Sequence, residues 1–253
     1  QENGSSMGRY QDGAPWEYIL SPNTNAANTT PVFDVVISEF MYHPRPTPDN
    51  PGDNSDDEYI EIQNASGSPV PLWTSAGPWR IDGDVAYTFP SNFTLAANST
   101  AVITSFVPTN ASDATLFQNS YGLTNNEVQI LGPYSGKLSN RGDRIALERP
   151  QEADVEGEKV SWVIMDEVIY FDQNPWPEAA DGTGQPLVRL DPQHAGNDPA
   201  NWQAGFWSSP GLPTPSFRIS VPNYAETVLL GSSVPLAAEL DSSVITGTVS
   251  GVE

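Results

Sequence analysis

The sequence has no cysteine, few cations and no long apolar run, and each of these absences excludes a class of protein. Without cysteine, the chain has no disulfide framework, no thiolate metal site and no thiol nucleophile. Ten Lys and Arg residues stand against 32 Asp and Glu residues, which gives a formal net charge of −22. We therefore expect neither nucleic acid nor an anionic membrane surface as a partner, because too few cations are available to neutralise phosphate groups. No apolar run reaches the roughly 18 residues that a transmembrane helix requires.

Groups that usually carry catalysis are also scarce. The two histidines, His43 and His194, have no carboxylates at metal-ligand spacing, so the sequence predicts no zinc site. No nucleophile elbow, phosphate-binding glycine loop or nicotinamide motif occurs. Glu39 and Glu61 would suit a glycosidase only if their carboxyl oxygens lay about 5–9 Å apart in an open cleft. If they share a sheet face, they can instead form a cation site or accept hydrogen bonds from loop amides. We predict that the protein is not an enzyme.

What the sequence does contain is 24 prolines and 20 glycines between short apolar runs. Turn residues at such short intervals favour an all-β sandwich over a parallel sheet. No stretch repeats apolar residues with helical spacing over three turns, so no long helix is expected. Strands are expected near residues 35–42, 58–64, 69–73, 86–90, 100–106, 126–131, 144–149, 161–171 and 186–190.

The first two predicted strands alternate in a way that assigns side chains to faces. Strict alternation places Ile37 and Met41 on the face opposite to Phe40. In the second strand, Tyr59 and Glu61 share a face by the same rule. Most tryptophans are expected to pack in the sandwich or at its ends, although one exposed tryptophan could instead stack on a sugar. The expected packing residues are Trp73, Trp79, Trp162, Trp176, Trp202 and Trp207.

The loop between these two strands contains the densest run of oxygen ligands in the chain. Ca²⁺ binds six to eight oxygens from carboxylates and carbonyls, and a flexible acidic loop can supply them. The spacing differs from that of an EF-hand, and a solvated acidic loop without metal would have the same composition. The predicted Ca²⁺ ligands are Asp49, Asp53, Asp56, Asp57 and Glu58.

Six Asn-x-Ser/Thr triplets suggest a secreted chain that carries N-linked glycans. A surface rich in Ser, Thr and Asn but without glycans would give the same pattern. The candidate acceptors are Asn3, Asn28, Asn64, Asn92, Asn98 and Asn110.

The composition divides the chain into three parts. Residues 1–33 read as an N-terminal extension with linker composition, which could be the end of a preceding unit. Residues 34–215 form the predicted sandwich. Residues 216–253 are a β-rich segment, either a partial immunoglobulin-like domain or a strand used for assembly, because a half-domain alone would leave an apolar face and an edge exposed.

An ordered set of blocks gives the chain a family resemblance. They include VISEFMYHP at 36–44, DEYIEIQN at 57–64, LGPYSGKLSNRGDRI at 131–145 and NDPANW at 197–202. In this order the blocks resemble the lamin-tail domain, in the form found on secreted and surface proteins of bacteria. The resemblance covers residues 36–213 and implies an immunoglobulin-like β-sandwich with no known active site. The following segment resembles the start of a bacterial immunoglobulin-like repeat.

Two functional hypotheses follow. The first is a non-catalytic structural or adhesive module of a secreted or cell-surface multidomain protein, with other domains or copies of itself as partners. A specific form of it is an extracellular fibre subunit that assembles by strand addition. The alternative is a binding accessory domain of a larger secreted enzyme, which recognises a carbohydrate or a ligand that depends on Ca²⁺.

Overall fold

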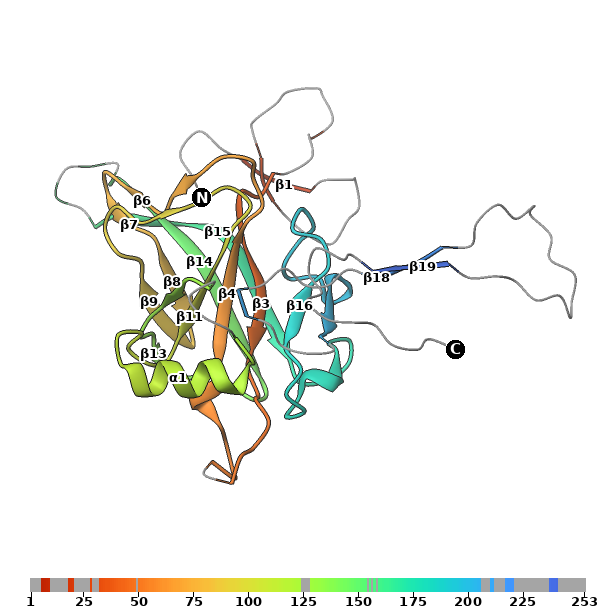
Figure 1. The fold of residues 1–253 in the computed structure, drawn as a ribbon. Helices are drawn as coiled ribbons and strands as arrows, with labels where there is room; N and C mark the ends of the chain where they lie inside the picture. The colour runs from red at the N-terminus through yellow and green to blue at the C-terminus, as the bar shows by residue number, and fades with distance from the viewer. Residues whose placement is uncertain are drawn as a thin grey trace, which may run out of the picture. The chain divides into compact units, whose positions relative to one another are not determined.

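The computed structural model describes residues 6–9, 18–20, 28, 32–48, 50–123, 128–153, 155, 157, 159–205, 210–211, 217–220 and 237–240. The chain divides into two compact units, residues 1–211 and residues 212–253. The first unit contains a β-sandwich (Figure 1). In the second unit, β18 (Phe217–Ser220) pairs antiparallel with β19 (Ala237–Leu240).

One layer of the sandwich is a six-stranded sheet with the order β12-β11-β4-β3-β16-β17. Neighbours in this sheet are antiparallel except β11 and β12, which are parallel. The strands, in sheet order, are β12 (Ile130–Leu131), β11 (Thr100–Thr104), β4 (Tyr59–Asn64), β3 (Val35–Met41), β16 (Leu187–Arg189) and β17 (Trp202–Ala204).

The other layer is a five-stranded, fully antiparallel sheet with the order β13-β9-β8-β14-β15. Its longest strands, β14 and β15, form the hairpin that crosses the centre of Figure 1. The strands, in sheet order, are β13 (Ser135–Gly136), β9 (Val85–Thr88), β8 (Arg80–Gly83), β14 (Gly142–Gln151) and β15 (Ser161–Phe171).

Short elements complete the first unit. The 10-residue helix α1 (Ala111–Ser120) follows β11, and none of the described helices is long and apolar enough to cross a bilayer. Three-residue 3₁₀ helices are η1 (Ser55–Asp57), η2 (Glu178–Ala180) and η3 (Pro199–Asn201). The two-stranded ribbons are β1 (Ser6–Gly8) with β2 (Tyr18–Leu20), β5 (Val70–Pro71) with β10 (Thr94–Leu95), and β6 (Trp73–Thr74) with β7 (Gly77–Pro78).

The main core lies between the two sheets and contains many aromatic side chains. Phe40 packs against Tyr170 and Trp202, with ring centroids 5.0 and 5.2 Å apart. A second apolar cluster covers the outer face of the six-stranded sheet, where Phe117 of α1 meets Tyr59 at 6.1 Å. The six-stranded sheet is therefore buried on both faces near β3 and β4, which explains why nearly every residue of β3 is buried.

A β-bulge in β3 corrects the predicted faces. The pairing of β3 with β4 shifts between Ile37 and Glu39, so Ser38 has no partner on β4. An extra residue reverses the alternation beyond it. Ile37 and Phe40 consequently both face the main core, whereas Met41 faces the second cluster. The predicted shared face of Ile37 and Met41 was wrong.

The predicted all-β immunoglobulin-like sandwich is confirmed. The second strand has the predicted faces, since Tyr59 lies in the outer cluster while Ile60 and Ile62 lie in the main core. The short helix α1 was not predicted, because only Phe117 among its residues is buried and no apolar period results. A local signal was present: Asn110 accepts a hydrogen bond from the Ser112 amide, as an N-cap residue does.

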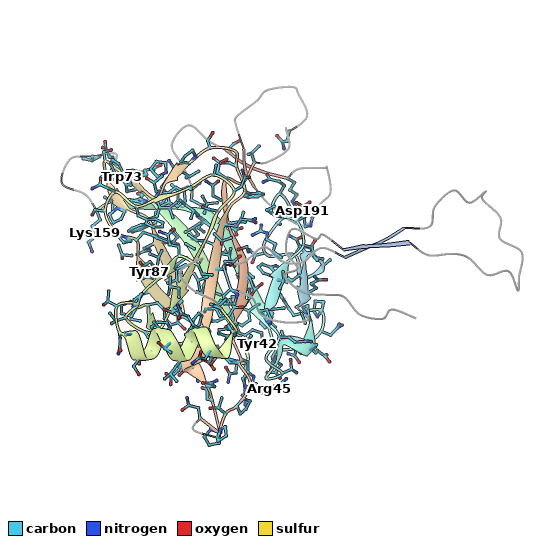
Figure 2. The ribbon with its side chains drawn as sticks, in the orientation of Figure 1. Tyr42, Arg45, Trp73, Tyr87, Lys159 and Asp191 are labelled. Carbon is cyan, nitrogen blue, oxygen red and sulfur yellow. The ribbon has the colours of Figure 1, made fainter. Side chains whose placement is uncertain are left out.

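The tryptophans divide into buried and exposed groups. Trp79, Trp176 and Trp202 are buried as expected. Trp73 is 40% exposed, and Figure 2 shows it at the end of the sandwich opposite to Tyr42 and Arg45. Trp207 lies outside the described residues.

Candidate functional site

The strongest candidate site lies where the acidic loop meets the turn of residues 137–140. Asp53 forms an ion pair with Lys137 and accepts a hydrogen bond from Asn140 Nδ2 at 3.3 Å. Glu58, which directly precedes β4, accepts from the Leu138 amide at 2.9 Å and from Tyr134 Oη at 3.1 Å, both through Oε2. Three of the four residues of this turn thus contact one of two carboxylates.

Glu58 is fully buried, and its second oxygen differs from the first. No hydrogen-bond donor among the described residues reaches Glu58 Oε1, and the same holds for Asn140 Oδ1 and Tyr42 Oη. Burial raises the pKa of Glu58 to about 7, against the lowering effect of the hydrogen bonds from Leu138 and Tyr134. A buried acceptor without a donor costs free energy, which makes Glu58 Oε1 a candidate for binding a ligand.

Two other predicted Ca²⁺ ligands, Asp56 and Asp57, accept hydrogen bonds from side-chain amides of the same loop. Asp56 accepts from Asn50 Nδ2 at 3.2 Å, and Asp57 accepts from Asn54 Nδ2 at 2.6 Å. Asp49 lies outside the described residues. Within the described ranges, no three His, Cys, Asp or Glu side chains gather into a group that could hold a metal ion. The five-carboxylate Ca²⁺ site stays a prediction.

Glu39 and Glu61 lie directly opposite each other on β3 and β4. Glu61 accepts from Ser38 Oγ at 2.5 Å and from the Gly211 amide at 2.6 Å. Glu39 accepts from the hydroxyl of Tyr59. Burial raises the pKa of Glu61 to about 7, although both of its donors lower it.

The burial and the hydrogen bonds of Glu39 and Glu61 test two of the roles considered for them, a glycosidase pair and acceptors for loop amides. Glu39 is 2% and Glu61 is 5% exposed, so neither lies in the open cleft that a glycosidase requires. Glu61 instead binds a loop amide, as the shared-face alternative allowed. Because Thr100 Oγ1 also donates to the Gly211 carbonyl at 2.9 Å, the end of the first unit is fixed on the outer face of the six-stranded sheet.

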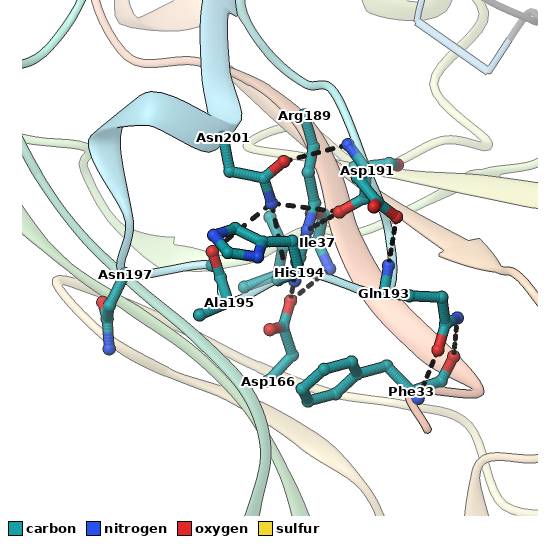
Figure 3. A network of polar contacts seen from close by, with 12 residues as sticks. Phe33, Ile37, Asp166, Arg189, Asp191, Gln193, His194, Ala195, Asn197 and Asn201 are labelled. Carbon is teal, nitrogen blue, oxygen red and sulfur yellow. Dashed lines mark hydrogen bonds and ion pairs between the residues drawn. The ribbon is translucent and has the colours of Figure 1, made fainter. Parts of the chain in front are cut away.

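A third polar cluster joins the loop after β16 to the sandwich (Figure 3). Asp166 of β15 and Arg189 of β16 form an ion pair of 2.5 Å between side chains that are 3% and 1% exposed. Asp166 also accepts from the Ile37 amide at 2.8 Å, beside the bulge. Arg189 donates further to the carbonyls of Ile37 and His194, at 3.1 and 2.6 Å. Burial raises the pKa of Asp166, while Arg189 opposes that rise.

Asn201 completes this cluster from the far side of the same loop. Its side chain donates to the carbonyls of Asp191, His194 and Ala195 and accepts from the Asp191 amide at 2.9 Å. Sequence reasoning did not find this network, because its members lie up to 164 residues apart and carry no motif spacing. The family blocks at 36–44 and 197–202, which contain Ile37 and Asn201, were the signals near it.

The candidate glycosylation sites differ in accessibility. Asn64 is fully buried, and its amide nitrogen donates to the carbonyls of Ser68, Leu95 and Ala96, so its position favours a structural role. The remaining acceptors have no such burial. Asn92, Asn98 and Asn110 are exposed, Asn28 is half-buried with its amide on the Arg9 carbonyl, and Asn3 lies outside the described residues.

The outer face of the five-stranded sheet carries a ladder of charges. Glu148 binds both Arg80 and Arg144, at 2.7 and 3.2 Å, and Arg144 continues to Glu167 at 2.6 Å. The Arg80 guanidinium lies 3.9 Å from the ring centroid of Trp162 and covers that ring. Trp162 is therefore less available for stacking on a sugar than Trp73 is.

Fold and sequence together identify the protein class. Two packed, mainly antiparallel sheets, with one short α-helix in the described part of the chain, define an immunoglobulin-like β-sandwich. The chain belongs to the Lamin Tail Domain family, whose model matches residues 28–164, more than half of the chain. The match ends inside β15, whereas the six-stranded sheet continues through β16 and β17.

Comparisons with individual proteins add little. No curated protein matches the chain. A crystal structure of a DUF4876 family protein from Bacteroides thetaiotaomicron is similar over 87% of this chain and 82% of that chain, with 13% identity and a TM-score of 0.40. That likeness is too distant to bear on the function of this chain.

Proposed function

We propose that the chain is a non-catalytic structural or adhesive module of a secreted or cell-surface multidomain protein. The observation that carries this proposal is the use of the buried polar side chains. Glu58, Glu61, Asn64 and Arg189 each bind backbone groups of a distant loop. Buried polar groups used in this way rigidify a scaffold.

A fibre subunit that assembles by strand addition is the specific form we favour. β15 is an edge strand of eleven residues, and among the described residues no strand pairs with its outer side. The loop before η3 contacts that side near the C-terminal end of the strand, at Glu167 and Ile169, which leaves the N-terminal part for pairing. Ile164, Ile169 and Phe171 of this strand are 40–48% exposed. A long, apolar edge is a template for pairing with another chain. The partner in this proposal is a second copy.

Light scattering across a range of protein concentrations tests the proposal. We expect the mass to rise with concentration, and we expect Ile164→Lys to reduce that rise because a charge on the edge strand opposes pairing. The matched control is Leu116→Lys on α1, a position that is 63% exposed and distant from the edge. A mass that stays monomeric at every concentration would rule out the fibre subunit and leave a spacer module.

Exposed Trp73 favours a second candidate, an accessory domain that binds a glycan. An exposed aromatic ring on a rigid ribbon offers an apolar face for stacking against a sugar ring. A glycan array probed with the whole chain and with Trp73→Ala tests this candidate, with Phe171→Ala as the control for loss of an exposed aromatic. Binding that Trp73→Ala abolishes would support it, and an array without signal would exclude it.

A further inference from the structure

The turn of residues 137–140 brings two carboxylates from the acidic loop to one place. Lys137 and Asn140 contact Asp53, and Leu138, between them, contacts Glu58. Asp53 and Glu58 are therefore neighbours across a span of four residues. Asn140 uses its amide nitrogen on Asp53, which leaves its amide oxygen without a donor among the described residues.

Two oxygens beside this turn are acceptors without a donor within the described ranges. Glu58 Oε1 and Asn140 Oδ1 are buried, and no donor in the described part of the chain reaches either atom. Glu58 as a whole is 0% exposed, so bulk water does not solvate it. Two carboxylates and one amide carbonyl are a typical hard-cation ligand set.

The ammonium group that pairs with Asp53 is held loosely. Lys137 pairs with Asp53, but the Lys137 side chain is 49% exposed. An exposed ion pair contributes little free energy, so a divalent ion can displace the ammonium group into solvent. The two positive charges of the ion would then balance the two negative charges of the carboxylates.

We propose that Asp53, Glu58 and Asn140 bind a Ca²⁺ ion, which we call the loop-base site. Ca²⁺ fits better than Mg²⁺ because Ca²⁺ accepts irregular sets of oxygen ligands, whereas Mg²⁺ demands near-ideal octahedral geometry. The loop-base site differs from the surface site predicted from the sequence, since it replaces Asp49, Asp56 and Asp57 by an asparagine 82 residues after Glu58. It depends neither on assembly nor on glycan binding.

Calorimetric titration of the whole chain with Ca²⁺ tests the loop-base site. Wild type should bind one Ca²⁺, and Glu58→Gln, which keeps the shape of the side chain but not its charge, should weaken binding at least tenfold. Lys137→Gln should strengthen binding, because it removes the competing ammonium group. Asp56→Asn and Asp57→Asn are the matched controls in the same loop and should leave the affinity unchanged.

Luminescence of bound Tb³⁺ provides a local readout, because Tyr134 lies 3.1 Å from Glu58 and can transfer excitation to the ion. Circular dichroism without metal confirms that each variant is folded. The proposal is overturned if wild type binds no Ca²⁺, or if the Asp56 and Asp57 variants lose binding while Glu58→Gln retains it. Equal affinity for Mg²⁺ would overturn the assignment to Ca²⁺.

Discussion

Buried acidic residues are the distinctive feature of this protein at the residue scale. Glu39, Glu58, Glu61 and Asp166 are each at most 5% exposed in a chain that already carries a large excess of negative charge. Each of them is held by donors from neighbouring or distant segments. A buried carboxyl group that stays paired is tolerated, whereas one that loses its partner is costly.

Replacement of Arg189 by an uncharged residue should therefore lower the free energy of unfolding strongly. We expect Arg189→Met to lower the free energy of unfolding by about 3–5 kcal/mol, because Asp166 stays buried without a counter-charge. Urea denaturation measures the change, with Arg141→Met at an exposed turn as the control. Adding Asp166→Leu should recover part of the loss. A double variant as unstable as the sum of both single changes would contradict this account.

Glu61 should make stability depend on pH. Its folded pKa is about 7 and its ordinary value is 4.5, so the folded state holds the proton more tightly. The stabilisation is complete below pH 4.5 and is lost as the pH rises through 7, an effect on the order of 3 kcal/mol. The groups that face Glu61 are Glu39, opposite on β3, and Tyr59.

Chemical denaturation between pH 4 and 8 checks the prediction by comparing wild type with Glu61→Gln. The free energy of unfolding of the variant should fall less than that of wild type between pH 4 and 8, because glutamine does not titrate. Glu152→Gln, at an exposed position, is the control. Parallel pH profiles for wild type and Glu61→Gln would show that Glu61 does not contribute.

At the scale of elements, the loop before η3 contacts the open edge of β15. Asn197 Oδ1 accepts from the Ile169 amide at 2.7 Å, and Asn197 Nδ2 donates to Glu167 at 3.0 Å. Gly196 lies so close to the strand that an added Cβ would stand 2.5 Å from the Glu167 carbonyl oxygen. The loop thus covers the C-terminal part of the edge, as natural sheets do to limit pairing, and leaves the part around Ile164 open.

We expect Asn197→Ala to increase self-association through β15. Hydrogen exchange should become faster at the Ile169 amide in dilute solution, because its acceptor is gone. Light scattering should then show a larger mass at high concentration, whereas Gln173→Ala, at an exposed loop position, should behave as wild type. Unchanged exchange at Ile169 would show that Asn197 does not protect this edge.

At the scale of the whole molecule, the net charge of −22 opposes compact structure. Screening reduces repulsion between exposed carboxylates. We expect NaCl up to about 0.5 M, with a chelator present to exclude divalent ions, to raise Tm by about 3–6 °C, or about 1–2 kcal/mol. Scanning calorimetry measures this, and a Tm that falls with salt would mean that the described ion pairs outweigh the repulsion.

Local patterns were enough to predict most of the fold. Strands appear near their predicted places from β3 to β16, since alternation and turn residues act over a few positions. β8 and the short strands β10, β13 and β17 were not predicted as strands, because runs of two to four residues are too short to show a period. The bulge at Ser38 escaped prediction for a different reason: it results from pairing with β4, which no single strand encodes.

The all-β class, the family and the acidic character could be predicted from the sequence, because these follow from composition and from short ordered blocks. The roles of the acidic residues emerge only in the folded protein. Folding brings Asp53 and Glu58 against one turn, joins Asp166 to Arg189, and sets Glu61 against the Gly211 amide. Burial and a partner distant in the chain fix the charge state and role of a carboxyl group, and both arise only when the sheets pack.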